Sequence, residues 1–530
     1  MSGLRIMHVI ARDLGNISKW SGRDSAYGKS SLCDYAASLN IARLSSGNPV
    51  FNAIWFSPFT ETTDQETPSK GELKQGSLYG IRNHFRLDPD VTSGNDDNDR
   101  DHLRHFCSQA HGNGIKVFGD LVFNHVPIDH PLAIEEHKMV DNLKNPERVF
   151  SPAGKLIGLR EEGDKNVRYL KFVYNADTLK PVVDGSLEQE WADVAKINYE
   201  SPAALNCFIK GENGKPGLWK EVIDWFLDSG FDGFRCDAAY KIPQPVWKEL
   251  IDHTRARNPD AVYIAETLGG SWDDMERNIA GSGFDLCTQG TYYWDIEDDW
   301  YRQEALTALK VARGGMGMAE THDVPDSVAA GISRLLRDQF NGMAETKIRQ
   351  AVEAVCLRDY ALSALLGSAV SMEYGFERQL GVASVFREPY LFAQRRKDAA
   401  ERQDPSHPMN ISAGIRSVNE YIEQITDRND TAVRLDNIKC LGNGVIRYDC
   451  TVINHDGDEI IGSQTVFASK QPERGTAFAD HCDFLPKDLD KSAHTFTLGG
   501  YLAASFTPGA PQFNKNPTVS NHHFLSPQPQ

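Results

Sequence analysis

Short apolar runs alternate with amphipathic segments along residues 1–380 of the chain. This alternation is typical of repeated β-α units, in which a buried strand is followed by a helix with one apolar face. Strands are predicted in the runs at 1–10, 51–56, 115–122, 233–237, 261–265, 316–319 and 368–372. Helices are predicted over 99–111, 219–227, 245–257, 300–312 and 345–366.

The pattern fits eight such strands, and therefore an α/β protein with a (β/α)8 TIM barrel whose active site lies at the carboxyl rim. Residues 127–201 are polar and rich in turns, so they are predicted to form an inserted subdomain after strand 3, with the barrel made of 1–126 and 202–425. Strand-like alternation over 430–513 predicts a small C-terminal antiparallel β domain, followed by a loose tail at 514–530.

Composition places the chain among soluble globular proteins, with 530 residues, 40% hydrophobic and 25% charged. A formal charge of -18 argues against a nucleic-acid partner, which needs a basic face, and is compatible with a neutral ligand such as a sugar. The first ten residues show no signal-peptide pattern, and no run approaches the length of a membrane span. Nine scattered cysteines favour reduced thiols and a cytoplasmic location.

Three carboxylates follow three of the apolar runs, namely Asp237, Glu266 and Asp323. All strands of a parallel sheet end on the same face, so these side chains are expected to gather at one rim. Arg235 lies two residues before Asp237, and its side chain would point in the same direction. One carboxylate as nucleophile, a second as acid and base, and a third beside them form a complete set for retaining glycoside transfer.

Four segments carry a resemblance to a known family: Asp120 to His125, Gly233 to Ala239, Ala265-Glu266, and Thr321 to Asp323. In this order, each at the end of a predicted strand, they resemble the conserved segments of the α-amylase family, glycoside hydrolase family thirteen. The resemblance covers most of residues 4 to 380 and, more weakly, the β domain that follows. It implies a retaining glycosidase acting on α-glucosidic bonds of α-glucans or maltooligosaccharides through a covalent glycosyl-enzyme.

The resemblance also implies a division of roles. Asp237 would be the nucleophile, Glu266 the general acid and base, and Asp323 the carboxylate that binds sugar hydroxyls and stabilises the oxocarbenium-like state. Arg235 would lie in the substrate site and favour the ionised form of Asp237 by its opposite charge. Glu266 must hold a proton near neutral pH, which requires burial or neighbouring carboxylates.

Further residues follow from the same motifs. His125 and His322 would donate hydrogen bonds to the sugar, and Tyr79 matches the aromatic residue that stacks on it. Asp120 and Asn124 would support the site, with Asp120 hydrogen-bonded to Arg235 or to a nearby backbone group.

Two departures from the family pattern bear on cofactor and acceptor. Many α-amylases bind structural calcium through the first-segment Asn and an Asp of the inserted subdomain; here Lys196 occupies the apparent Asp position. A lysine cannot ligate calcium, so no metal and no cofactor are expected. Where the family often carries Lys-His after the nucleophile, this chain has Tyr240 and Lys241, which leaves open whether water or another sugar is the acceptor.

Two alternatives stay open. Segments 76–83 and 319–323 are similar to the maltosyltransferases that use maltose 1-phosphate, which favours an α-glucan glycosyltransferase of the same fold. The family also includes non-catalytic members, so a sugar-binding protein with an idle site is the second alternative. The expected partner is an α-glucan or oligosaccharide, with neither nucleic acid nor membrane, and the sequence indicates no oligomeric state.

Overall fold

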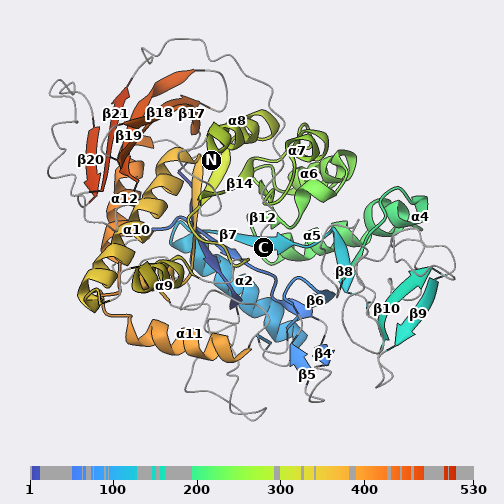
Figure 1. The fold of residues 1–530 in the computed structure, drawn as a ribbon. Helices are drawn as coiled ribbons and strands as arrows, with labels where there is room; N and C mark the ends of the chain where they lie inside the picture. The colour runs from blue at the N-terminus through green and yellow to red at the C-terminus, as the bar shows by residue number, and fades with distance from the viewer. Residues whose placement is uncertain are drawn as a thin grey trace.

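A closed barrel of eight parallel strands forms the centre of the protein (Figure 1). The structure is a computed structural model that describes residues 3–11, 50–62, 64–66, 73–75, 77–88, 91–92, 95–127, 130, 146–150, 156–161, 194–291, 299–323, 327–339, 342–380, 389–426, 431–441, 444–454, 459–470, 494–498 and 501–508. Around the barrel the strands are β1 (Arg5–Val9), β16 (Ala369–Glu373), β15 (Gly315–Met318), β14 (Leu286–Gly290), β13 (Val262–Ala265), β12 (Gly233–Cys236), β7 (Lys116–Leu121) and β2 (Ala53–Phe56). The predicted α/β barrel is confirmed.

Helices surround this barrel and alternate with its strands. They are α2 (Asp96–Gly112), α4 (Pro202–Leu205), α5 (Leu218–Asp228), α6 (Gln244–Arg257), α7 (Trp272–Asn278), α8 (Asp299–Val311), α9 (Val328–Gln339), α10 (Glu345–Leu366), α11 (Pro389–Glu401) and α12 (Ser412–Thr426). The five helices predicted from the sequence are present, and the bounds of α10 match the prediction. Gly230, which follows α5, has φ 97°, and an added Cβ would lie 2.8 Å from Cβ of Cys107, so only glycine fits this turn.

Two apolar layers hold the barrel together. The inner layer fills the barrel itself, with large side chains such as Trp55, Phe118 and Met316 fully buried. The outer layer lies between strands and helices and includes Phe234 and Cys236 of β12. Because side chains alternate along a strand, these two residues point outward while Arg235 between them points to the interior.

Short antiparallel pairs interrupt the alternation after the third barrel strand. β8 (His125–Pro127) pairs with β11 (Val194–Lys196), and β9 (Pro146–Phe150) pairs with β10 (Leu156–Glu161). Before α2, β3 (Thr60–Thr62) pairs with β6 (Ile81–Leu87), and β4 (Asp64–Glu66) with β5 (Leu73–Gln75). The predicted domain boundaries stay a prediction. The strand β8 spans the predicted boundary between the barrel and the inserted subdomain at residues 126 and 127.

A five-stranded antiparallel sheet follows the barrel, as the sequence predicted. Its order is β17 (Thr431–Leu441), β18 (Val445–Asn454), β19 (Ile460–Ser469), β21 (Leu502–Pro508) and β20 (His494–Leu498). β17 packs against α8 and α10, and β20 against α12 (Figure 1). The predicted tail at 514–530 lies outside the described residues.

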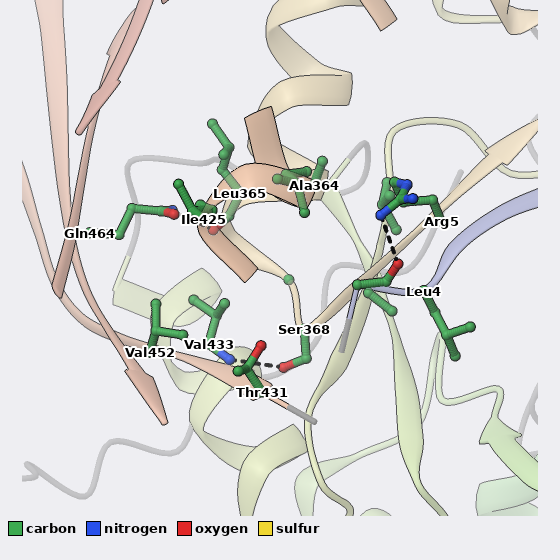
Figure 2. A pocket seen from close by; sticks show the side chains of 15 residues that line it. Leu4, Arg5, Ala364, Leu365, Ser368, Ile425, Thr431, Val433, Val452 and Gln464 are labelled. Atoms are coloured by element: carbon green, nitrogen blue, oxygen red, sulfur yellow. Dashed lines mark hydrogen bonds between the residues drawn. The ribbon is translucent and has the colours of Figure 1, made fainter. Parts of the chain in front are cut away.

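Figure 2 shows a small cavity where this sheet meets the amino ends of β1 and β16. Its volume is about 20 Å³, and Arg5, Ser368 and Gln464 are among its lining residues. The backbone N–H of Val433 donates to Oγ of Ser368 at 3.1 Å, which ties the sheet to the barrel. A cavity of this size holds about one water molecule and is too small for a substrate. Among the described residues, no helix has the length and apolar character of a membrane span.

Candidate active site

The register of the barrel places Arg235 beside Asp120. Arg235 in β12 lies opposite Asp120 in β7, and opposite Ile264 in β13 on its other side. The ladder continues past the strand ends, because the N–H of Asp237 donates to the Leu121 carbonyl at 2.9 Å. The N–H of Glu266 likewise donates to the carbonyl of Cys236, at 3.0 Å.

The guanidinium of Arg235 contacts two carboxylates and lies near a third. Its Nη1 donates to Oδ1 of Asp237 at 2.9 Å and to Oδ1 of Asp120 at 3.1 Å. Its Nη2 lies 4.0 Å from Oε2 of Glu266. The two carboxylates predicted to do the chemistry therefore lie at the same rim, on one guanidinium that is itself 2% exposed.

Glu266 lies in an environment that favours its protonated form. Burial raises the pKa of this carboxyl to about 8, with smaller contributions in the same direction from Asp237 and Asp323. Arg235 and the backbone N–H of Ala238, which donates to Oε2 of Glu266 at 2.8 Å, act in the opposite direction. The rise is the shift that a general acid working near neutral pH requires.

Asp120 is fully enclosed and serves as an acceptor. Besides Arg235, it accepts hydrogen bonds at Oδ2 from Nε1 of Trp55 and from the hydroxyl of Tyr79, both at 3.2 Å. Burial raises the pKa of Asp120 to about 7, while its ion pair with Arg235 works against that rise. The contact with Arg235 is the one expected from the sequence.

Two histidines at the rim are buried and neutral near pH 7. Burial lowers the pKa of His322 and, further, that of His8. The ring of His322 is stacked on Tyr79 with centroids 5.3 Å apart, and its Nε2 lies 2.7 Å from the Tyr79 hydroxyl. His8 stacks on Trp55 at 3.8 Å. Neither ring adds a positive charge beside Arg235.

His125 and Asn124 lie at the start of the insertion. Nε2 of His125 is 3.1 Å from the backbone carbonyl of Tyr79, so this nitrogen is engaged by the protein as a donor. Contact of His125 with a sugar stays a prediction. Asn124 accepts the N–H of Ile197 at its carbonyl, 2.9 Å away, and its side-chain Oδ1 is buried without a hydrogen-bond partner among the described residues.

Asp323 is the most open of the predicted site residues. Its side chain is 43% exposed, and Oδ1 lies 3.6 Å from Nε2 of His322. Its N–H donates to Oγ1 of Thr321 at 3.3 Å. The carboxylate therefore lies at the rim next to His322, within reach of solvent.

Sequence reasoning did not identify His8, Trp55 or Ala238 as parts of this site. His8 could have been noticed in the sequence, because its polar ring follows two apolar residues within a predicted strand. Trp55 did not, because an inward tryptophan looks like ordinary core. Ala238 has φ 43° and ψ 41°, a left-handed conformation that costs a residue with a Cβ roughly 1–3 kcal/mol. This turn aims its N–H at Glu266.

Taken together, the fold and the site define a (β/α)8 barrel with buried carboxylates at its carboxyl rim. Residues 50–270 match the family model described as alpha amylase, catalytic domain. Over these residues the chain is similar to the catalytic domain of the α-amylase family.

Curated relatives also match this chain over part of its length. The chain is 26% identical over 227 residues to an alpha-1,4-glucan:maltose-1-phosphate maltosyltransferase of Burkholderia pseudomallei, covering 43% of this chain and 18% of that protein. It is 27% identical over 239 residues to a cyclomaltodextrinase of a Bacillus species, covering 44% of this chain and 33% of that protein. The chain thus spans a third or less of the length of these relatives.

Solved structures share the fold across nearly the whole chain. An alpha-amylase from Geobacillus thermoleovorans, complexed with acarbose, superposes with a TM-score of 0.54 at 13% identity, covering 95% of this chain and 98% of that one. A cyclic alpha-maltosyl-(1-->6)-maltose hydrolase from Arthrobacter globiformis gives 0.52 at 14% identity, covering 96% and 98%. At these identities the likeness concerns the fold alone.

The raised pKa of Glu266 predicts a pH dependence of stability. Between pH 4.5 and about 8, the folded protein keeps a proton on Glu266 that the unfolded chain has lost. Each rise in pH through this window therefore lowers the free energy of unfolding. Glu266→Gln, which cannot ionise, should gain stability relative to the wild type as the pH rises, measured by urea unfolding across the window.

The exposed variant Asp252→Asn is the control, since its carboxylate is on the surface, and its pH profile should follow that of the wild type. Asp120 also titrates in the window, so only the difference between variant and wild type is interpreted. Equal pH slopes for Glu266→Gln and the wild type would show that Glu266 is ionised in the folded protein.

Proposed function

We propose that this protein is a retaining glycosidase that cleaves α-glucosidic bonds of α-glucans or maltooligosaccharides. The observation that carries the proposal is the pair Asp237 and Glu266 on one buried guanidinium, with burial raising the pKa of Glu266 to about 8. Two carboxyl groups at one rim, one paired with a cation and the other kept protonated, are what a double-displacement mechanism uses. The match of residues 50–270 to the alpha-amylase family model supports the choice of an α-glucan as substrate.

Asp237 is the nucleophile in this proposal. Arg235 binds its Oδ1, while Oδ2 is buried and has no hydrogen-bond partner among the described residues. Oδ2 is therefore the oxygen whose lone pair attacks the anomeric carbon. As the new bond forms, the glycosidic C–O bond breaks and the leaving oxygen takes the proton of Glu266.

Glu266 then acts as the base. The ionised carboxylate removes a proton from water, whose oxygen attacks the anomeric carbon and displaces Asp237 with overall retention. Asp323, exposed beside His322, binds sugar hydroxyls and stabilises the positive charge of the transition state. Tyr79, 9% exposed, and His322 form the wall against which the sugar lies.

A second candidate function is transfer to another sugar rather than to water. It is favoured by the similarity to a maltosyltransferase and by the residues after the nucleophile. Tyr240 packs so closely over Gly270 that an added Cβ would lie 2.8 Å from its ring, and Nζ of Lys241 lies 5.6 Å from that ring. An aromatic ring and an ammonium in the segment that follows the nucleophile would suit an acceptor sugar or a phosphate.

Product analysis separates these functions. The protein is incubated with maltooligosaccharides, with and without phosphate or maltose 1-phosphate, and the products are resolved by chromatography. Shorter sugars alone support hydrolysis, and chains longer than the substrate support transfer. Activity of the wild type on a chromogenic maltooligosaccharide that is lost in Asp237→Asn excludes a sugar-binding protein with an idle site.

The roles of the two carboxylates can be distinguished by trapping. Glu266→Ala should lose roughly 10²–10⁴-fold in rate on a substrate whose leaving group needs a proton. An activated glucosyl fluoride should still glycosylate Asp237 in this variant, because fluoride leaves without a proton. The covalent intermediate should accumulate and be seen by mass spectrometry, and azide should release a glucosyl azide of retained configuration.

Asp237→Ala is the matched variant and should not be labelled. Labelling of Asp237→Ala but not of Glu266→Ala would show that the two roles are reversed. An azide product of inverted configuration would contradict the double displacement.

We also propose that the site needs no calcium. Ca²⁺ takes six to eight oxygen ligands, whereas Lys196 lies opposite His125, the residue after Asn124, in the β8–β11 pair. Groups of three or more His, Cys, Asp or Glu able to hold a metal are absent from the described residues. A lysine at this position has no oxygen in its side chain to offer a calcium ion.

Chelation should therefore leave the Tm unchanged. A specific ion at a hundredfold excess over its Kd would contribute about 2.7 kcal/mol, which a thermal scan in EDTA resolves easily. A fall in Tm that calcium alone reverses, and magnesium does not, would contradict the proposal.

A further inference from the structure

The side chain of Glu320 forms a hydrogen bond with the backbone of Val328, and Asp323 lies between these two residues in the sequence. Glu320 lies two residues after β15 and is 5% exposed. Its Oε2 accepts the backbone N–H of Val328, the first residue of α9, at 2.6 Å. One buried hydrogen bond therefore links the end of a barrel strand to the start of the next helix, with Asp323 between them.

Charged and polar groups on the surrounding elements face this carboxyl. Arg395 of α11 and Glu377, after β16, act on it electrostatically, and Cys356 of α10 lies close enough to be affected by its charge. Arg395 is fixed in turn, since its Nη2 donates to the carbonyl of Tyr374 at 2.7 Å. Burial raises the pKa of Glu320 to about 7. The group is thus part of packed structure and is not directed at solvent.

Asp323 itself has little packing to fix it. Its side chain is 43% exposed, and its contacts within the described part of the chain, with Thr321 and His322, come from the residues just before it. These contacts hold one side of the segment. On the other side, the link from Glu320 to Val328 sets where the chain returns to the helix.

We propose that Glu320 is a positioning residue for Asp323, acting through its hydrogen bond to the Val328 amide. The proposal rests on the role assigned to Asp323 in the proposed function. A displacement of about 1 Å of a group in an active site can reduce the rate by roughly 10²-fold. Loss of the link should therefore reduce kcat although Glu320 touches no substrate.

The test compares Glu320→Ala with Glu320→Gln, which keeps an oxygen able to accept from Val328. In Glu320→Ala, hydrogen exchange of the Val328 amide should accelerate, and kcat per folded molecule on a maltooligosaccharide should fall roughly 10- to 100-fold. Glu320→Gln should keep the slow exchange and a kcat within about threefold of the wild type. If Glu320→Ala does not fold, Glu320→Asp, one methylene too short to reach Val328, replaces it.

Asp285→Ala is the control for a purely structural effect. Asp285 is also buried and accepts a backbone N–H, that of Tyr263 at 2.8 Å, but at the amino end of the barrel. It should lower the Tm and leave kcat per folded molecule within about threefold of the wild type. An equal loss of kcat in this control would overturn the positioning role.

Two further results would overturn the proposal: a kcat unchanged in Glu320→Ala, or a Glu320→Gln as slow as Glu320→Ala. A wild type inactive on every α-glucan would instead remove the proposed function. In that case the exchange of the Asp323 and Val328 amides still tests the link. Unchanged exchange of both amides in Glu320→Ala would show that the hydrogen bond does not hold the segment in place.

Discussion

The site depends on one buried guanidinium that serves three carboxylates. Arg235 binds Asp120 and Asp237 directly and lies 4.0 Å from Glu266. A single positive charge cannot offset three negative charges in a buried site, where charges are costly unless they are paired. His8 and His322 do not add charge, because burial lowers the pKa of each. Burial, the largest cause of the raised pKa of Glu266, acts together with this shortage of positive charge to favour the protonated form of Glu266.

The geometry of the barrel brings the three carboxyls close to a single arginine. The parallel register fixes Arg235 opposite Asp120, and the hydrogen-bond ladder carries Asp237 and Glu266 one residue beyond their strands. Below them the inner apolar layer closes the barrel and excludes water from that side. Two neighbouring strand ends thus hold two carboxyls in different environments around one guanidinium, which neither strand could do alone.

Much of this arrangement could be predicted from the sequence. Apolar runs are strong signals for buried parallel strands, and a carboxylate after such a run must lie at the rim. β14 was not among the runs identified, because Leu286–Gly290 contains Thr288 and Gln289 and has no continuous apolar stretch. The helix α9 (Val328–Gln339) was also missed, although its buried residues Val328, Ala329 and Leu336 follow a helical spacing.

Apart from the contact between Asp120 and Arg235, the contacts between distant segments could not be predicted. Nothing in the sequence indicates that Glu320 reaches the Val328 amide, that Nε2 of His125 is engaged by the carbonyl of Tyr79, or that His322 stacks on Tyr79. These contacts depend on how loops from different strands meet, and single-sequence patterns record only local periodicity. The motifs indicated which residues gather at the rim; the structure shows how their charges are shared.

The central claim is that Glu266 carries a proton at neutral pH while Asp237 accepts from Arg235. Neutron diffraction from a deuterated crystal near pH 7 observes this directly, because it locates deuterium on individual carboxyl oxygens. We expect a deuteron on the Glu266 carboxyl and none on Oδ1 of Asp237, which faces the deuterated guanidinium of Arg235. A bare Glu266, or a deuteron on Asp237 in its place, would contradict this account of the site.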